Sequence, residues 1–145
     1  TKNDMLRAVV LEGLDAISAA VAKAASSGKS PQARFEAMLR AHLGQLLGSE
    51  GRDFAATLLH ESRHLDTAEL AELVTLRDRY EAMWQKALKD LKRAGLIADD
   101  SPVARLFLMG ALNWTVQWYR PEGSKSIDQL ARQLAAFVIG RPQSK

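Results

Sequence analysis

One segment of this sequence is apolar on nearly every side, and it limits the folds that the chain can adopt. Between Val103 and Tyr119 the only charged residue is Arg105. A helix at the surface of a globular protein carries a polar face, so a helix formed by this segment has to be covered on more than one side. A second copy of the chain would supply that cover, since stable homodimer interfaces resemble a domain core cut in half. The alternative is a central core helix in a monomer.

Proline, glycine and capping residues divide the chain into six expected helices. Ser30-Pro31 and Ser101-Pro102 each pair an N-cap with a proline at the first helical position. Ser126 with Gln129 forms a capping box, and Gly95 follows the end of a long helical pattern. Alanine and leucine are abundant, whereas the strand-forming residues valine, isoleucine and threonine are sparse. The sequence predicts one all-α domain with helices at about residues 4–26, 31–47, 53–65, 66–94, 101–119 and 126–140.

The composition excludes several classes of protein. The 145 residues include no cysteine, which excludes a disulfide framework and a cysteine-ligated zinc site. No apolar run approaches the roughly 20 residues that a membrane-spanning helix needs, and the sequence opens on polar and charged residues rather than on a signal-peptide pattern. The formal net charge of +3 does not mark a dedicated nucleic-acid surface. We expect a cytoplasmic protein without membrane contact.

A five-residue motif argues for a different function. His60-Glu61-Ser62-Arg63-His64 matches the H-E-x-x-H pattern, in which two histidines on one helical face bind zinc and the glutamate acts as general base. The surroundings are unfavourable, because a third ligand such as Glu81 would lie in the middle of a long helix and no sheet or second lobe would build a cleft. We expect no metal, no cofactor and no catalytic residue. A zinc metallopeptidase and a helical interaction module without a ligand remain as alternatives.

Three stretches of the sequence resemble the TetR family of bacterial transcriptional regulators. The stretch Leu112-Asn113-Trp114-Thr115-Val116-Gln117-Trp118-Tyr119-Arg120-Pro121-Glu122-Gly123 resembles the turn that joins the last two helices in that family. The run Leu76-Arg77-Asp78-Arg79-Tyr80-Glu81-Ala82-Met83-Trp84 is similar to its long central helix, and Lys2-Asn3-Asp4-Met5-Leu6-Arg7-Ala8-Val9 resembles the segment that follows its DNA-binding motif. The resemblance covers nearly the whole chain.

The resemblance implies a fold, partners and a mechanism. It implies the six-helix C-terminal ligand-binding and dimerisation domain, in which the last two helices of two copies form a four-helix interface. The family's helix-turn-helix is expected upstream of residue 1, so operator DNA would be bound by the parent dimer, expected to be a repressor, and not by residues 1–145. A small effector would shift the helix that begins at Asp4 and so alter DNA binding.

The expected effector is hydrophobic or amphipathic, and an acyl-CoA-like thioester is one candidate, because the expected pocket wall is mostly apolar and aromatic. Each apolar wall residue could equally fill the core. Arg77 falls at the edge of an apolar stripe, where it would either pair with Glu81 or a neighbouring carboxylate, or anchor an anionic ligand. Asn113 is a polar residue in an apolar run and needs a partner: a backbone group, its twin across a dimer, or the ligand. His42 is expected at the edge of the core rather than at the ligand. The candidate ligand-binding residues are Phe35, Leu39, Leu59, Arg63, Leu76, Arg77, Tyr80, Met83, Trp84 and Asn113.

The expected dimer interface draws on the last two helices. Gly110 would permit a close approach of two helices, and the large apolar residues around it would be divided between the interface and the core. The pattern does not assign each residue to one of the two, because the segment 103–119 has two faces to bury. The candidate interface residues are Phe107, Gly110, Trp114, Trp118, Leu130, Leu134 and Phe137.

Overall fold

The computed structural model of the chain describes residues 1–28, 30–48 and 67–140. These ranges contain the helices α1 (Lys2–Ala25), α2 (Pro31–Leu47), α4 (Thr67–Arg93), α5 (Pro102–Trp118) and α6 (Ile127–Ile139), and no strand. The predicted all-α fold is therefore confirmed. The helix expected over residues 53–65 lies outside the described residues. None of the described helices is long and apolar enough to cross a membrane.

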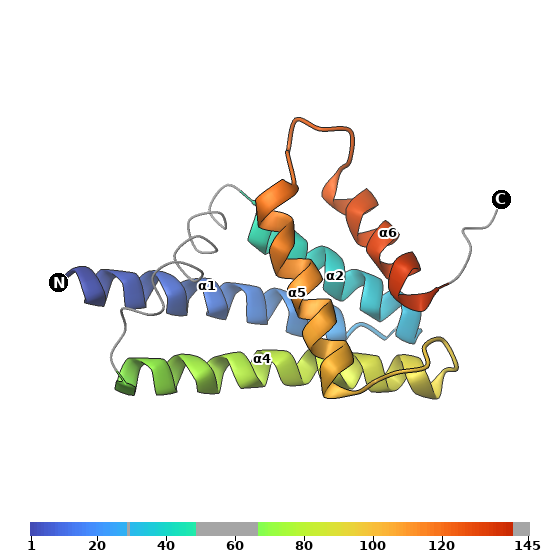
Figure 1. Cartoon of the computed structure of the whole chain (residues 1–145), viewed down its shortest axis with the longest axis horizontal. Helices are drawn as coiled ribbons and strands as arrows, with labels where there is room; N and C mark the ends of the chain where they lie inside the picture. The colour runs from blue at the N-terminus through green and yellow to red at the C-terminus, as the bar shows by residue number, and fades with distance from the viewer. Residues whose placement is uncertain (29, 49–66, 141–145) are drawn as a thin grey trace.

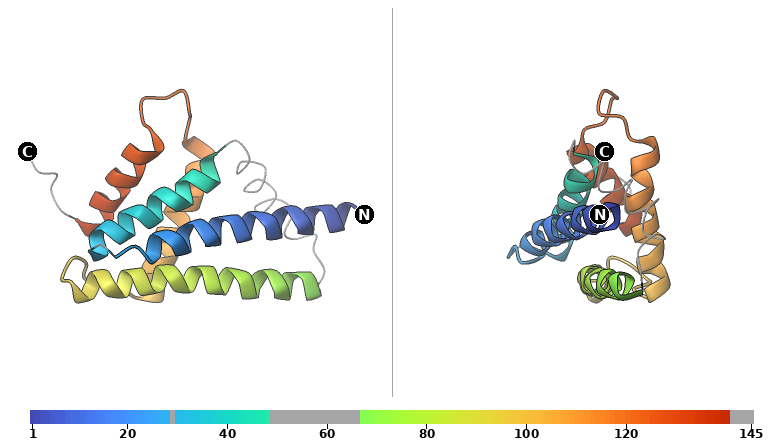
Figure 2. Two further views of the ribbon diagram at one scale, coloured as in Figure 1. Left: turned by 180° about the vertical axis from the view of Figure 1, so that it is seen from behind. Right: turned by 90° about the vertical axis from the view of Figure 1, so that its left-hand side faces the viewer.

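Helix α2 is the centre of the arrangement, because it contacts each of the other four helices. The long helices α1 and α4 lie side by side and run in the same direction, and α2 returns along α1 (Figures 1 and 2). Helix α5 crosses this layer, and α6 descends from the α5–α6 turn to pack on α2 (Figure 1). Residues that are far apart in the sequence are thus brought together where α1, α2, α4 and α5 meet.

The helix ends follow the local signals in the sequence. The Oγ atoms of Ser30 and Ser101 each accept a hydrogen bond from the backbone N–H three residues later, at 3.2 Å, which supplies a partner to a donor that the first helical turn leaves unpaired. Ser126 and Gln129 form the predicted capping box. Gly95 takes a φ of +75°, a left-handed conformation that glycine adopts without strain, just after α4 ends.

Helix α5 has two faces of different exposure. Leu108, Met109, Leu112 and Thr115 face the core and are buried. The opposite face leaves large apolar side chains in the open: Phe107 is 76% exposed, Trp114 64% and Trp118 53%, and Phe137 of α6 is 83% exposed. Gly110 is exposed with them, while Leu130 and Leu134 are half-buried against the core. The structure thereby separates the α5 residues that are buried in the core from those that are exposed in the single chain.

Candidate functional site

Three polar side chains from three helices form a hydrogen-bonded triad inside the core. His42 on α2 places its Nδ1 2.5 Å from the Tyr80 Oη on α4 and its Nε2 3.1 Å from the Asn113 Oδ1 on α5. His42 and Tyr80 are buried, and their rings stack with centroids 5.8 Å apart. A buried polar group is costly unless it has a partner. The triad therefore fixes α2, α4 and α5 relative to one another.

The donors and acceptors of the triad define one arrangement of protons. The Oδ1 of Asn113 only accepts, so the Nε2–H of His42 donates to it. In a neutral imidazole the Nδ1 is then an acceptor, and it receives the Tyr80 O–H. Burial lowers the pKa of His42 to about 4, against the opposing effect of its bond to Asn113. Burial also raises the pKa of the Tyr80 phenol, so both groups are neutral near pH 7.

The buried histidine should make stability depend on pH. The pKa of His42 is lowered in the folded chain from 6.5 to about 4. Between these values the unfolded chain takes up a proton that the folded chain does not, so the free energy of unfolding should fall as the pH drops from about 6.5 to about 4, by about 3 kcal/mol. Urea unfolding at pH 7, 5.5 and 4 would measure this fall. In His42→Gln the fall in the free energy of unfolding over the same pH range should be smaller by about 3 kcal/mol. An equal fall in both proteins would contradict a neutral His42.

A cavity of about 50 Å³ opens beside the triad, and we call it the triad cavity. Leu14 and Ile17 of α1 and Leu46 of α2 give it an apolar side, and Arg77 and Glu81 of α4 give it charged groups. Four helices thus supply one small space with hydrogen-bonding and ionic side chains around an apolar wall. Such a combination suits an apolar molecule that carries a polar group. The lining residues are Leu14, Ile17, His42, Leu46, Arg77, Tyr80, Glu81, Met109 and Asn113.

The ion pair formed by Glu81 at the triad cavity differs from one that the sequence suggested. An ion pair of Arg77 with Glu81 was one possibility, but Glu81 Oε2 lies 3.5 Å from the Nη1 of Arg105, the only charged residue of α5. Both partners of that pair are only one-fifth exposed. Arg77 is exposed and makes no ion pair within the described ranges. Arg77 is therefore a cation at the triad cavity whose charge is not neutralised by Glu81.

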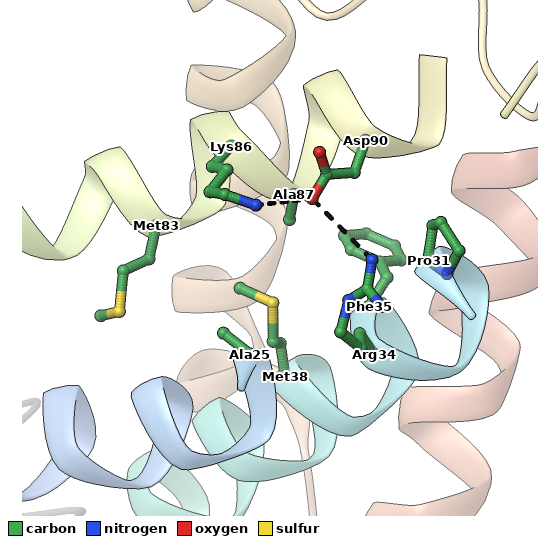
Figure 3. Close-up of a pocket in the computed structure, with 9 residues that line it drawn as sticks. All are labelled: Ala25, Pro31, Arg34, Phe35, Met38, Met83, Lys86, Ala87 and Asp90. Atoms are coloured by element: carbon green, nitrogen blue, oxygen red, sulfur yellow. Dashed lines mark hydrogen bonds and ion pairs between the residues drawn. The ribbon is translucent and has the colours of Figure 1, made fainter. Parts of the chain in front are cut away.

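The structure separates the other candidate ligand residues into groups. Phe35, Leu39 and Trp84 are fully buried core residues, and Leu76 and Met83 are half-buried against them. Arg77, Tyr80 and Asn113 meet at the triad cavity. Phe35 and Met83 line a second cavity on the same seam of α1, α2 and α4 (Figure 3). Leu59, Arg63 and the motif His60-Glu61-Ser62-Arg63-His64 lie outside the described residues.

Sequence reasoning placed His42 at the edge of the core, and the structure places it inside. It is 2% exposed, holds both other members of the triad and lines the cavity. The available signal was its position in the apolar stripe of α2 between Leu39 and Leu43, both fully buried. A histidine in such a stripe needs two partners for its two ring nitrogens, just as the amide of Asn113 needs a partner in an apolar run.

Comparisons with known proteins agree with this fold. The family model described as "Tetracyclin repressor-like, C-terminal domain" matches residues 28–141. The crystal structure of superantigen PfiT is 33% identical and has a TM-score of 0.82, over 95% of this chain and 73% of that protein. The TetR family transcriptional regulator PfmR from Thermus thermophilus is 23% identical, with a TM-score of 0.85 over 99% of this chain and 78% of its own. AibR, in a crystal structure with isovaleryl coenzyme A and operator DNA, is 21% identical and has a TM-score of 0.82, over 96% of this chain and 75% of AibR. No curated protein sequence matches the chain.

Proposed function

This chain belongs to the family of tetracyclin repressor-like C-terminal domains, and on that premise we propose that it is the effector-sensing and dimerisation domain of a transcriptional regulator. The effector binds in the triad cavity, and the observation that carries this is the buried triad of His42, Tyr80 and Asn113 beside an apolar wall. The domain works by binding and not by catalysis. Operator DNA is contacted by a separate DNA-binding domain of the parent, a repressor in our proposal.

The lining of the triad cavity suits an effector that has an apolar part and a polar part. Its apolar wall accepts a short hydrocarbon group, and the amide N–H donors of Asn113 and the guanidinium of Arg77 suit a carbonyl or an anionic oxygen. An acyl-CoA thioester has both parts, an acyl chain with a carbonyl and a phosphate-bearing tail. The relative AibR was crystallised with isovaleryl coenzyme A, which supports a thioester of this kind as the effector class.

The position of α1 explains how binding would be transmitted. Leu14 and Ile17 of α1 line the triad cavity together with groups from α2, α4 and α5. A ligand that enters the triad cavity has to displace one of its walls. Near the start of α1, the ion pair of Arg7 with Glu72 connects α1 to α4. If the ligand binds the displaced arrangement of α1 more tightly, it shifts the population toward that arrangement. Such a differential affinity is the physical content of the proposed regulation.

We also propose that two copies pair through α5 and α6. The apolar face formed by Phe107, Trp114, Trp118 and Phe137 is exposed in the single chain, and exposed groups of large apolar side chains are typical of protein interfaces. A two-fold pairing would bring the two helices of each copy into a four-helix interface with aromatic residues at its centre. The exposure of Gly110 on the same face leaves room for close approach of the two α5 helices.

The effector proposal is tested by thermal unfolding with isovaleryl-CoA, octanoyl-CoA and free CoA. A ligand present at 100 times its Kd stabilises the folded state by about 2.7 kcal/mol, which should raise the Tm by roughly 5–10 °C. Asn113→Leu should abolish most of this rise, because it removes the amide at the cavity. Gln117→Leu, an exposed residue on the same helix, is the matched control and should keep it. The proposal would be contradicted if the acyl-CoA thioesters raised the Tm no more than free CoA does. It would also be contradicted if Asn113→Leu showed the same rise in Tm as the unchanged chain.

A further inference from the structure

Helices α5 and α6 leave an open cavity between them, which we call the α5–α6 groove. It has a volume of about 360 Å³ and reaches inward to Leu88 of α4 and Leu108 of α5, which are buried. Phe107 of α5 and Phe137 of α6 line its outer part, since they are 76% and 83% exposed. The groove therefore opens onto the face through which we propose that two copies pair. It shares no lining residue with the triad cavity.

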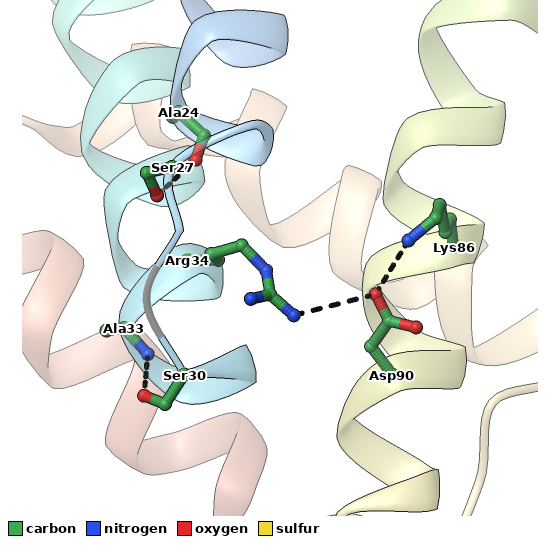
Figure 4. Close-up of polar contacts among 7 residues, drawn as sticks. All are labelled: Ala24, Ser27, Ser30, Ala33, Arg34, Lys86 and Asp90. Carbon is green, nitrogen blue, oxygen red and sulfur yellow. Dashed lines mark hydrogen bonds and ion pairs between the residues drawn. The ribbon is translucent and has the colours of Figure 1, made fainter.

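The inner side of the groove is held in place by contacts behind it. Leu88 belongs to α4, and Asp90 of the same helix has its Oδ2 4.0 Å from the Arg34 Nη2 of α2 and 2.9 Å from the Lys86 Nζ (Figure 4). The ion pair with Arg34 connects α4 to α2, and α2 in turn packs on α6. The groove is therefore already formed in the single chain, and an occupant does not bear the cost of creating it.

The lining of the groove favours an apolar occupant without a negative charge. Asp99 is the only charged or polar residue in its described lining, and this carboxylate would repel an anionic ligand such as the proposed thioester effector. The small side chains of Ala104 and Ala111 leave space beside the two phenylalanine rings. A cavity of about 150 Å³ accepts benzene, so about 360 Å³ has room for the larger ring of a tryptophan.

The exposed face of α5 can supply that ring from a second copy. Gly110 and Ala111 are small exposed residues, with Phe107 about one turn before them and Trp114 about one turn after them. In a two-fold pair of antiparallel helices, residues at equal distances on either side of the crossing point lie opposite each other. If the two α5 helices cross at Gly110 and Ala111, where a close approach is possible, the partner's Trp114 lies opposite Phe107 at the mouth of the groove.

The exposed rings offer enough area for this pairing. Phe107, Trp114, Trp118 and Phe137 are each more than half exposed. An aromatic side chain has about 150–250 Å² of surface, so the four rings present roughly 550 Å² per copy. A stable interface of standard size buries about 800 Å² per partner. Aromatic rings alone therefore supply a large part of the area that a stable dimer needs.

We propose that in the dimer the Trp114 indole of each copy inserts into the α5–α6 groove of the other copy, between Phe107 and Phe137. The two α5 helices are antiparallel and cross at Gly110 and Ala111. Each copy thus contributes one residue to the groove of the other, and the two insertions are equivalent by symmetry. This inference rests on the proposed dimerisation through α5 and α6, and it adds the register of the helices and the residue that fills the groove.

Disulfide cross-linking tests the register. The chain has no cysteine, so an engineered cysteine reports only on its own position. Gly110→Cys should form a disulfide-linked dimer under mild oxidation, because a disulfide needs Cα atoms within about 7 Å and the helices are closest at their crossing. Phe107→Cys should not, because its two copies would lie about 10 Å apart along the antiparallel helices. Parallel helices would instead allow both variants to cross-link.

A double-mutant cycle tests the insertion itself, with sedimentation as the measure of the dimer Kd. Trp114→Ala should raise the Kd about 100-fold or more, because both grooves of the dimer lose their occupant. Phe107→Ala removes a wall against which the ring packs, so the double variant should raise the Kd about tenfold less than the product of the single effects. Within one chain the two residues lie about 10 Å apart along the helix, so this coupling reports a contact between copies. Phe107→Ala with Trp118→Ala is the control pair and should be additive.

The outcomes separate this inference from the proposed function. A parent chain that stays monomeric at the highest attainable concentration would overturn both. A dimer whose Kd is unchanged by Trp114→Ala, in which Trp114 and Phe107 act additively, or in which Phe107→Cys cross-links by itself would overturn the insertion alone. Circular dichroism should be unchanged in Trp114→Ala, because this side chain is 64% exposed in the single chain.

Discussion

Replacing both Phe107 and Phe137 with glutamate should convert a dimer of this chain into monomers that keep their helical fold. Both side chains are more than three-quarters exposed in the single chain, so the substitutions leave the core intact. In the proposed interface each aromatic ring would be desolvated against the partner's apolar face, and loss of about 2 kcal/mol or more at each of the two rings raises the dimer Kd by at least roughly 1,000-fold. Analytical ultracentrifugation over a range of protein concentrations would measure the Kd.

A control on another surface separates this effect from a general effect of added charge. Met5, on α1, is 71% exposed, and Met5→Glu should leave the dimer Kd unchanged. Far-ultraviolet circular dichroism should be the same for all three proteins. If the double variant dimerises as tightly as the parent chain, the proposed pairing through α5 and α6 is wrong. Native mass spectrometry of the parent would also reveal a co-purified effector by its mass.

Trp84→Ala should cost about 4 kcal/mol of the free energy of unfolding, the largest effect that we expect from any single core substitution. Trp84 is fully buried and its ring contacts Phe35, His42 and Tyr80, so the truncation loses both transfer free energy and packing around an empty space. Urea unfolding at one fixed protein concentration measures the change, since the stability of a dimer depends on concentration. Val74→Ala, at a partly exposed position of the same helix, should cost less than about 0.5 kcal/mol.

Indole gives this prediction a second and independent outcome. Trp84→Ala would leave an apolar space of the shape of the lost ring, between Phe35, His42 and Tyr80. Indole should therefore stabilise the variant and have little effect on the parent chain, as small aromatic molecules do in engineered cavities. A destabilised variant that indole does not stabilise would mean that the helices collapse onto the gap.

The fold could be predicted because its signals are local. The pair Ser30-Pro31 and the capping box of Ser126 with Gln129 act within one helical turn, and the structure shows both at helix starts. The apolar stripe of α4 is likewise a property of spacing along one helix, and its members Leu73, Leu88 and Leu91 are buried. The two-faced character of α5 was evident from its near lack of charge. Which residue belongs to which face was not, because both faces are apolar.

The site was harder to predict because its contacts join distant parts of the chain. Tyr80 and Asn113 were each singled out as ligand candidates, but His42, which lies 38 and 71 residues from them in sequence, holds them together. The pair of Arg77 with Glu81, one of the alternatives for Arg77, follows from helical spacing alone. Arg105 takes Glu81 instead, because α5 crosses α4 at that point and no periodicity within α4 reveals what lies opposite.

The hydrogen-bonded triad also limits how a chain of this kind can diverge. A change at His42 alone leaves the buried phenol of Tyr80 without its partner, and a change at Asn113 alone leaves the buried Nε2–H of His42 without one. Each single step passes through a state with an unpaired buried group, which costs about 1–3 kcal/mol, whereas replacing all the partners by apolar residues is nearly neutral. We therefore expect substitutions at these three positions to occur together in related chains, although the positions lie on three different helices.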